Sequence, residues 1–431
     1  MADESTTKDK IYLCKYKVET LVLMKGEEKI ELDHSNILNV EYMNDYEFNL
    51  RAIIKIRLRM DVRKRLWVLK NKKEIICKFE LNKFGMDPEV EEIITGIENV
   101  WNQEFSIYLN DEDDSNDVEV MEQRIKKNEG DEFKNNDLKD ENYFESQNTF
   151  DIYLFNQTLL NASQKIFNHV FTKNTLQQMV GRMLTETKHD KVLMSKFENN
   201  EIYSELLVPA HPLYKDLIYL DQYYGFYKKG AIIYYDWDVL YLLNGNGKIT
   251  AKRENEWVET IFMVTKLDES TPGNGMIRKE GEKKFYIGIT DMNINPKKFT
   301  IGHNIDIGSE AKVIITDDTE IEIDEADQSY IDQRNEFITF RRKDENKYIA
   351  EILRARMEEN ECILYINAEN LDINAFTPNK QYSVVFDEPT KQKKFGKYKY
   401  RVTYAYHMMK LESEGFMSSS HMIMLKRIPE D

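Results

Sequence analysis

The sequence predicts a β-rich α+β multidomain protein in which two β-rich regions flank a mixed α/β middle region. The chain has 431 residues, which predicts two to four domains, and 41 % of the residues are hydrophobic, enough for real cores. Ile54, Ile56 and Leu58 alternate with Lys55 and Arg57, the pattern of a half-buried strand. Many short segments of this kind, with turn signals between them, indicate a small β-barrel or sandwich.

The N-terminal region is predicted to consist of strands. The segment 21–32 is typical of a hairpin that turns near Gly26, and residues 84–88 interrupt the series. A last strand follows the acidic segment 111–145, and we expect it to complete the first barrel. The predicted strands lie at 11–24, 28–32, 38–43, 50–60, 65–70, 74–82, 105–109 and 150–160.

The segment 111–145 holds 14 Asp and Glu against five Lys and Arg, a net charge of −9. This composition is too polar to bury a core, so we predict a flexible or solvated insertion between two strands. Its carboxylates do not follow the spacing of an EF-hand loop, so a calcium loop is not predicted.

The middle region mixes helix and strand. Residues 163–171 and 174–187 carry apolar residues at helical spacing, with Ser163 and Asn174 as candidate N-caps, and a short helix is expected at 212–220. Further strands are expected at 231–235 and 236–243, with a helical turn as the alternative for the second of these.

The chain is predicted to be β-rich again after the turn signal at 244–247. The candidate strands are 257–265, 284–292, 299–303, 312–316, 336–341, 348–355, 363–366, 381–386, 397–409 and 420–427.

Residues 216–243 hold nine aromatic side chains, where the chain's average of 12 % would give about three. This segment has no His, Cys or Ser, whereas Tyr combines a large buried area with a polar tip. We therefore predict a rigid structural element or an interface instead of a reaction centre. The interface candidates are Tyr219, Tyr223, Tyr224, Tyr227, Tyr234, Trp237 and Tyr241.

Charge and hydropathy exclude several classes of protein. There is no apolar run of about 18 residues, and the N-terminus is polar, so neither membrane insertion nor a signal peptide is predicted. A net charge of −17 disfavours nucleic-acid binding, because the chain repels phosphates. Basic patches at 51–73 and 391–401 are interpreted as solvated strand faces or as faces that dock on an acidic partner.

The cysteines and histidines predict no metal, cofactor or disulfide. Cys14, Cys77 and Cys362 are odd in number and far apart, which is typical of buried thiols. His407 and His421 flank one predicted hairpin, but two histidines without a third type of ligand nearby do not predict a metal site.

No catalytic residue is predicted. The sequence contains no phosphate-binding glycine loop, HExxH, GxSxG or CxxC motif. Asp236 and Asp238 would share one face of a strand, as a metal or glycosidase pair could. Carboxylates that cap backbone groups at strand ends are much commoner, and Glu201, Glu205 and His211 have no stronger case.

The order of features in the central block carries a family resemblance. A helix near 174–187 is followed by the matching residues Tyr219, Leu220, Asp221, Tyr224, Gly225, Tyr227, Gly230, Ile233, Tyr234, Asp236, Asp238, Leu240 and Tyr241. The C-terminal segments 377–380, 398–401, 412–416 and 422–427 follow in the order of the family's last β domain. In this order the chain resembles the baseplate central hub proteins of contractile-tailed bacteriophages.

The resemblance implies a non-enzymatic homotrimer in which each chain carries two small β-barrel-like domains. Three chains would then present six barrels in a pseudo-sixfold ring. The implied domains are 1–161, an N-terminal β-barrel with the acidic insertion 111–145; 162–247, a mixed α/β middle domain; 248–360, a β-rich domain; and 361–431, a C-terminal β-barrel-like domain.

The implied role is a symmetry adaptor between a sixfold tail tube protein and a threefold central spike protein. Tape measure and wedge proteins are further possible partners, and the location would be the virion tail baseplate after assembly in the host cytoplasm. Another virion or injection-system protein, such as a wedge or adaptor, is the first alternative. A cell-wall glycosidase using Asp236 or Asp238, or a glycan-binding module, ranks well behind.

Overall fold

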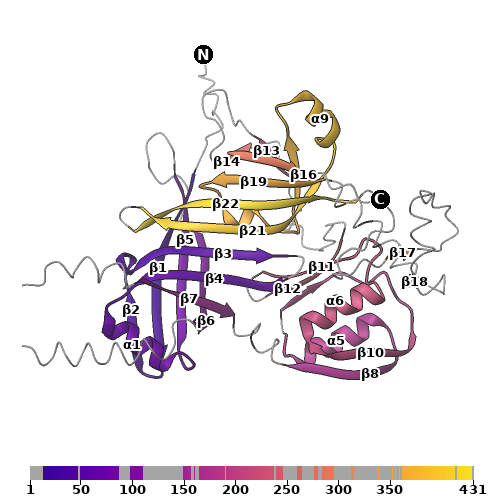
Figure 1. Ribbon diagram of the computed structural model, residues 1–431, viewed down its shortest axis with the longest axis horizontal. Helices are drawn as coiled ribbons and strands as arrows, with labels where there is room; N and C mark the ends of the chain where they lie inside the picture. The colour runs from indigo at the N-terminus through magenta and orange to yellow at the C-terminus, as the bar shows by residue number, and fades with distance from the viewer. Residues whose placement is uncertain are drawn as a thin grey trace, which may run out of the picture.

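The computed structural model is β-rich with few helices, as the sequence predicts (Figure 1). The structure describes residues 13–46, 49–86, 98–109, 149–156, 160, 165–189, 191–236, 239–245, 260–264, 276–279, 284–295, 312–314, 337–339, 352, 355, 359, 362–412 and 415–429. The acidic insertion 111–145 and the predicted strand 299–303 lie outside these residues.

Eight antiparallel strands form a closed circuit of pairings, which we call the first ring. Each strand pairs with the next and the last pairs with the first. The circuit runs through β1 (Leu13–Lys25), β5 (Ile76–Met86), β6 (Glu98–Tyr108), β7 (Thr149–Asn156), β4 (Asn49–Arg59), β3 (Ile37–Asp45), β21 (Tyr400–Leu411) and β22 (Phe416–Arg427). Closure leaves no strand of the circuit with an open edge along its paired length.

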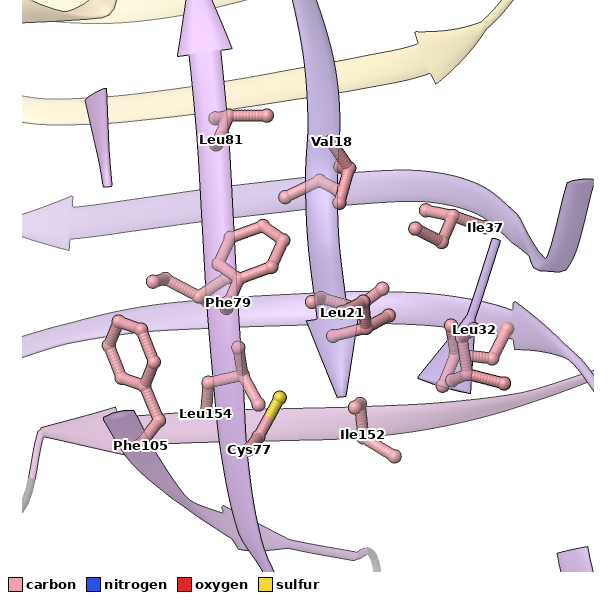
Figure 2. Close-up of a cluster of buried hydrophobic side chains, with 14 of the residues drawn as sticks. Val18, Leu21, Leu32, Ile37, Cys77, Phe79, Leu81, Phe105, Ile152 and Leu154 are labelled. Carbon is pink, nitrogen blue, oxygen red and sulfur yellow. The ribbon is translucent and has the colours of Figure 1, made fainter. Parts of the chain in front are cut away.

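The first ring encloses a core that its alternating strands build. Figure 2 shows Phe79 and Leu81 on β5 and Ile152 and Leu154 on β7, with their side chains in one shared interior. All four are buried, and Trp101 of β6 packs against Phe79 with ring centroids 5.6 Å apart. The period-two pattern of the sequence therefore translates directly into the wall of this ring.

The prediction of a strand at 65–70 is wrong, because α1 (Val62–Asn71) occupies this segment. Asp61 caps the helix by accepting hydrogen bonds from the backbone N–H groups of Arg63 and Lys64. The helix connects β4 to β5, which are not neighbours in the ring, so the chain has to cross the ring's end. The strand β2 (Glu28–Leu32) follows β1 in sequence and pairs with it as a hairpin, and the short 3-10 helix η1 (His34–Asn36) follows β2.

A second group of strands lies next to the first ring and surrounds a core of its own. Ile289 donates to the carbonyl of Val264 and Thr290 to that of Asn367, so the short link from β15 to β16 connects the two sides of the group. In order of pairing the strands are β14 (Met276–Lys279), β15 (Lys284–Gly288), β13 (Thr260–Val264), β20 (Gln381–Val385), β21, β22, β19 (Ile363–Glu369) and β16 (Asp291–Asn295).

The hairpin of β21 and β22 belongs to both groups, and we call it the shared hairpin. Met409 and Met417 point into the core of the first ring, whereas Val402, Ile423 and Leu425 belong to the second core. The pairings of β21 with β3 and of β22 with β1 cross the predicted domain boundaries at 161 and 361. The N-terminal strands thus do not close a ring without the C-terminal hairpin.

The middle region forms a third core, which α5 and α6 cover on one side (Figure 1). The prediction of a helix at 163–171 is wrong: β8 pairs antiparallel with β10, and this partner strand outweighs the four-residue spacing of Phe167 and Phe171. The helix at 174–187 is confirmed, with Thr175 as its N-cap in place of Asn174. The elements are β8 (Ile166–Asn174), α5 (Leu176–Glu186), β9 (Val192–Met194), β10 (Tyr203–Pro212), α6 (Leu213–Tyr223), β11 (Ala231–Asp236) and β12 (Val239–Asn244).

The remaining elements are short. Ile352 and Ala355 are helical, so the strand predicted at 348–355 is wrong at these positions. The other elements are β17 (Lys312–Ile314), β18 (Phe337–Thr339), η3 (Ile373–Ala375) and α9 (Pro389–Phe395).

Because the shared hairpin builds both cores, we expect damage to one core to loosen the other. Leu425→Ala removes a fully buried side chain of the second core and should lower the free energy of unfolding by about 2–5 kcal/mol. Hydrogen exchange should then accelerate in β3 and β4 of the first ring as well as in β19. Faster exchange confined to the second group would contradict this coupling.

Candidate interaction surfaces

The aromatic segment begins with a turn that Asp221 organises. Its two carboxylate oxygens accept hydrogen bonds from the backbone N–H groups of Phe226 and Ala231, both at 3.1 Å. Gly225 and Gly230 flank this turn with φ values of 70° and 75°, which side chains disfavour. The Tyr, Asp and Gly pattern of the segment therefore encodes the exit from α6 into β11.

Tyr227 and Tyr234, two of the seven interface candidates, are fully buried inside the subunit. The Tyr227 hydroxyl donates to backbone carbonyls of Ser195 at 2.8 Å or Leu242 at 3.2 Å, and burial raises its pKa. Tyr234 stacks on Tyr241 with ring centroids 4.7 Å apart. These side chains are therefore packed within the chain.

Tyr234 also joins the middle region to the rest of the molecule. Its ring meets the ring of Tyr46 edge to face at 5.3 Å, and Asn44 donates to the carbonyl of Tyr235 at 3.3 Å. Both contacts connect the end of β3 to β11. Some aromatic side chains of the segment therefore hold the middle region against the first ring.

The other candidates differ in their exposure. Tyr223 is 61 % exposed and its ring lies 4.4 Å from that of half-buried Tyr219. Tyr224 packs against Tyr203 at 5.3 Å. Trp237 lies outside the described residues. Tyr223 is thus the most exposed of the described candidates, and Tyr219, Tyr224 and Tyr241 are half-buried.

The structure adds nothing to the case for catalysis or metal binding. Asp236 ends β11 opposite Val239, and Asp238 lies outside the described part of the chain. No group of three or more His, Cys, Asp or Glu suited to a metal ion occurs among the described residues. Cys14, Cys77 and Cys362 are buried, as predicted, and are not joined by disulfides.

Asp216 is a buried carboxyl that the sequence does not reveal. It is fully buried in the first turn of α6, and burial raises its pKa to about 7. Half-exposed His211 lies 3.7 Å away, between its Nδ1 and the Oδ1 of Asp216. A single carboxyl beside one imidazole lacks the further groups that a reaction centre needs.

His407 and His421 form a buried pair on the shared hairpin. They lie opposite each other in the β21–β22 register, and their Nδ1 atoms are 2.6 Å apart. The backbone N–H of Leu371 donates to Nε2 of His421 at 3.2 Å, which makes that nitrogen an acceptor. The proton of His421 is therefore on Nδ1, and this N–H donates a hydrogen bond to Nδ1 of His407. The pair is structural, and burial lowers both pKa values, that of His421 to about 3.

Two apolar surfaces are visible only in the structure. The first, the ribbon face, consists of Ile166, Val170 and Leu207 on β8 and β10, which are 63, 59 and 51 % exposed. Val170 and Leu207 lie directly opposite each other, and the side chains of Phe167, Phe171 and Leu206 on the other face pack into the third core. The sequence could have indicated this surface only through a strand at β8, and the four-residue spacing of Phe167 and Phe171 suggested a helix there instead.

The second surface, the Met/Tyr face, lies on the outside of the shared hairpin and β19. Register places Tyr404 next to Met424 and Met424 next to Tyr365, and it places Tyr406 next to Met422. Tyr365 and Met422 are 38 and 44 % exposed, and the others are half-buried. With Met408 the face consists of Tyr365, Tyr404, Tyr406, Met408, Met422 and Met424.

We predict that Asp221→Ala lowers the free energy of unfolding by about 2–3 kcal/mol, because it leaves one buried and one partly buried N–H group without their acceptor. Urea unfolding measures the change. Gln222→Ala, at the exposed neighbouring position, is the control and should change the stability little. An equal loss in both variants would contradict the assigned role of the carboxylate.

The histidine pair predicts a loss of stability in acid. Both folded pKa values lie below the unfolded value near 6.5, so the stabilisation is complete above that pH and is lost as the pH falls towards the folded values. Between pH 7 and pH 5 the loss from His421 alone should be about 2 kcal/mol. His421→Gln keeps an acceptor for Leu371 but cannot titrate, so urea unfolding of this variant should depend less steeply on pH. An unchanged slope would refute this account.

No described helix has the length and apolar character needed to cross a bilayer.

The chain is similar to several solved structures, all at low sequence identity. A tail protein from Neisseria meningitidis MC58 shows 9 % identity and a TM-score of 0.48, with 95 % of this chain and 96 % of that chain covered. The PdpA–VgrG complex in its lidless form shows 7 % identity and a TM-score of 0.46, with 99 % and 67 % covered. The c3393 protein of the E. coli type VI secretion system, described as similar to bacteriophage T4 tail proteins gp27 and gp5, shows 9 % identity and a TM-score of 0.40, with 97 % and 77 % covered.

No curated protein matches the sequence. The family model described as Bacteriophage PBS1 gene 109 protein, in contrast, matches residues 5–428, nearly the whole chain. The match confirms that the chain is of bacteriophage type, as the resemblance of its central block predicted. This chain therefore belongs to the family of the bacteriophage PBS1 gene 109 protein.

Proposed function

We propose that this protein is a structural component of a phage tail baseplate, namely a homotrimeric central hub that joins a sixfold tail tube to a threefold spike. The observation that carries the proposal is the presence, in one chain of a phage protein family, of a closed strand ring and a second strand group with its own core. Three such chains would present six ring-like units to the tube and a threefold arrangement to the spike.

In this proposal the first ring is one small β-barrel and the second strand group is the other. The shared hairpin holds the two at a fixed distance, because β21 and β22 contribute side chains to both cores. An adaptor between two symmetries needs such rigid spacing, since six units can match a sixfold partner only if each chain fixes its own pair. The boundaries 1–161, 162–247, 248–360 and 361–431 describe the proposed domains, with this hairpin as their common element.

We further propose that the protein acts without catalysis. The aromatic segment, the strongest signal of the sequence, forms a turn, a core and an internal joint. Buried His407 and His421 pair with each other, and His421 accepts from the backbone N–H of Leu371. Peptidoglycan turnover that is present in the native protein and lost in Asp236→Asn with Asp238→Asn would contradict this proposal.

The tail role is tested in phage particles that lack the gene for this chain. We expect particles with heads but without assembled baseplates, and we expect purified wild-type tails to contain three copies at the junction of tube and spike. Electron microscopy of the tail gives the symmetry. Sixfold density with many copies per ring would favour a tube or wedge protein, and absence from purified tails would refute the role.

A further inference from the structure

We propose that Asp216 and His211 form a proton-dependent latch at the corner where β10 leads into α6. The corner, residues 208–216, stays closed while the pair holds a proton and opens when the pair holds none. The inference goes beyond the proposed function, and its tests use the purified full chain without any tail partner.

Asp216 is a buried acid without a hydrogen-bond donor. Its side chain is fully buried, and neither Oδ1 nor Oδ2 has a hydrogen-bond partner in the described part of the chain. Asp221, on the same helix, is also buried, but its two oxygens accept hydrogen bonds from two backbone N–H groups. Burial without donors disfavours the charged form of a carboxyl. The surroundings of Asp216 therefore favour the neutral acid, whereas those of Asp221 supply donors for a carboxylate.

His211 is the group that can pair with this carboxyl. Its Nδ1 lies 3.7 Å from Oδ1 of Asp216, slightly beyond hydrogen-bond distance, and its side chain is 47 % exposed. Water therefore reaches the imidazole, and a small rotation of the side chain would bring the nitrogen into contact. His211 lies opposite Phe167 near the end of β10, just after a shift in the strand register that begins at Val208. The pair thus lies where the strand pairing is already irregular.

The tyrosines near α6 supply no positive charge for Asp216. On α6 itself, the pKa of Tyr219 is raised by burial and by the nearby Tyr223 and Asp216. On β11, the hydroxyl of Tyr235 is hydrogen-bonded to His189. Phenols stay neutral below about pH 10, so neither hydroxyl can neutralise a carboxylate.

The other elements that pack on α6 are β10, β8 and α5, which contribute apolar side chains to the third core. Apart from His211, the histidine and the charged side chains of these three elements are exposed. They are His169, Lys173, Arg182, Glu186 and Glu205. Burial is accordingly what raises the pKa of Asp216, to about 7.

Two effects oppose this burial and favour the carboxylate. The N-terminus of α6 stabilises a negative charge in the first turn of the helix, and a protonated imidazole nearby does the same. Imidazoles titrate in the range where this carboxyl does, so the pair loses its last proton close to neutral pH. The latch therefore changes state between about pH 6 and pH 8.

Loss of the last proton leaves a buried charge without a partner, and the corner is the part of the chain that can move to admit water. β10 pairs with β8 alone among the described residues, its register shifts before His211, and Pro212 has no backbone N–H to donate. The bonds of Asp221 hold the other end of α6. We expect the end of β10 and the first turn of α6 to separate while the Asp221 turn stays in place.

Hydrogen exchange of the full chain tests the latch. After correction for the intrinsic pH dependence of exchange, backbone amides of residues 206–217 should lose protection about tenfold or more between pH 6 and pH 8.5, with a midpoint near pH 7. Amides of α5 should keep their protection. Asp216→Asn cannot ionise, so its corner should stay protected at both pH values. Protection in the wild type that does not depend on pH, or an equal loss in Asp216→Asn, would overturn the latch.

Infrared spectroscopy of the wild type tests the proton directly and needs no variant to fold. Exposed carboxyl groups are ionised at pH 6, so a carboxylic-acid band that persists at pH 6 and disappears by pH 8.5 reports a buried neutral acid. The band should be absent from Asp216→Asn. A wild type without this band at pH 6 would contradict a proton on Asp216.

Urea unfolding gives an independent check of the sign. The folded pKa of Asp216 lies above the usual value of 3.8, so burial of the neutral acid stabilises the chain at low pH, and this contribution is lost as the pH rises towards 7. Relative to Asp216→Asn, the wild type should lose stability over that range. The buried pair of His407 and His421 is present in both chains, so its opposite pH dependence cancels in the difference. Equal pH dependence in the two chains would refute the latch.

Two further variants separate the partners. Glu205→Gln is the matched control, because it removes an exposed carboxyl from β10 and should keep the wild-type pH dependence. His211→Gln removes the imidazole and should move the midpoint of exchange to lower pH, because the last proton can no longer be shared between two sites. An unchanged midpoint in His211→Gln would exclude His211 from the latch and overturn the pairing.

Discussion

The structure depends on one constraint above all others, the pairing of a single C-terminal hairpin with strands from the N-terminal end of the chain. β21 lies between β3 and β22 over most of its length. β22 pairs with β1 near its start and with β19 farther along. Each strand of the hairpin is long enough, at 12 residues, to fill one core at one end and the second core at the other. The entropy of closing so long a chain segment is offset only because both cores gain from the same closure.

Buried polar groups fix the hairpin in its place. The histidine pair spans its two strands, and Phe376 packs against both imidazole rings at 5.8 and 5.6 Å. At the start of β21, Arg401 donates to Glu359 at 2.7 Å and to the carbonyl of Gly245 at 3.1 Å, with both charged side chains nearly buried. Such groups add little net stability, but a shifted register would leave them without partners. They favour one arrangement of the hairpin over its neighbours.

The aromatic segment likewise contributes both to the interior of the subunit and to its surface. Large aromatic side chains are needed both in cores and at interfaces, so their number alone does not separate the two uses. Within the subunit, Tyr227 packs in the third core and Tyr234 in the second, while Tyr223 is exposed. The outward Tyr and Met side chains of the shared hairpin carry a weaker sequence signal, because apolar side chains such as Ala405, Ile423 and Leu425 alternate with them and make the segment resemble a buried strand.

The sequence by itself determined the β-rich class, most strands, the helices at 176–186 and 213–223, and the phage-type character of the chain. These follow from local periodicity, caps and turn residues, which depend on near neighbours along the chain. Only the tertiary structure decided that residues 166–174 form a strand, that the N-terminal ring closes with C-terminal strands, and which tyrosines face outward. Those outcomes depend on partners hundreds of residues away, and no local pattern encodes which distant strand will supply the missing hydrogen bonds.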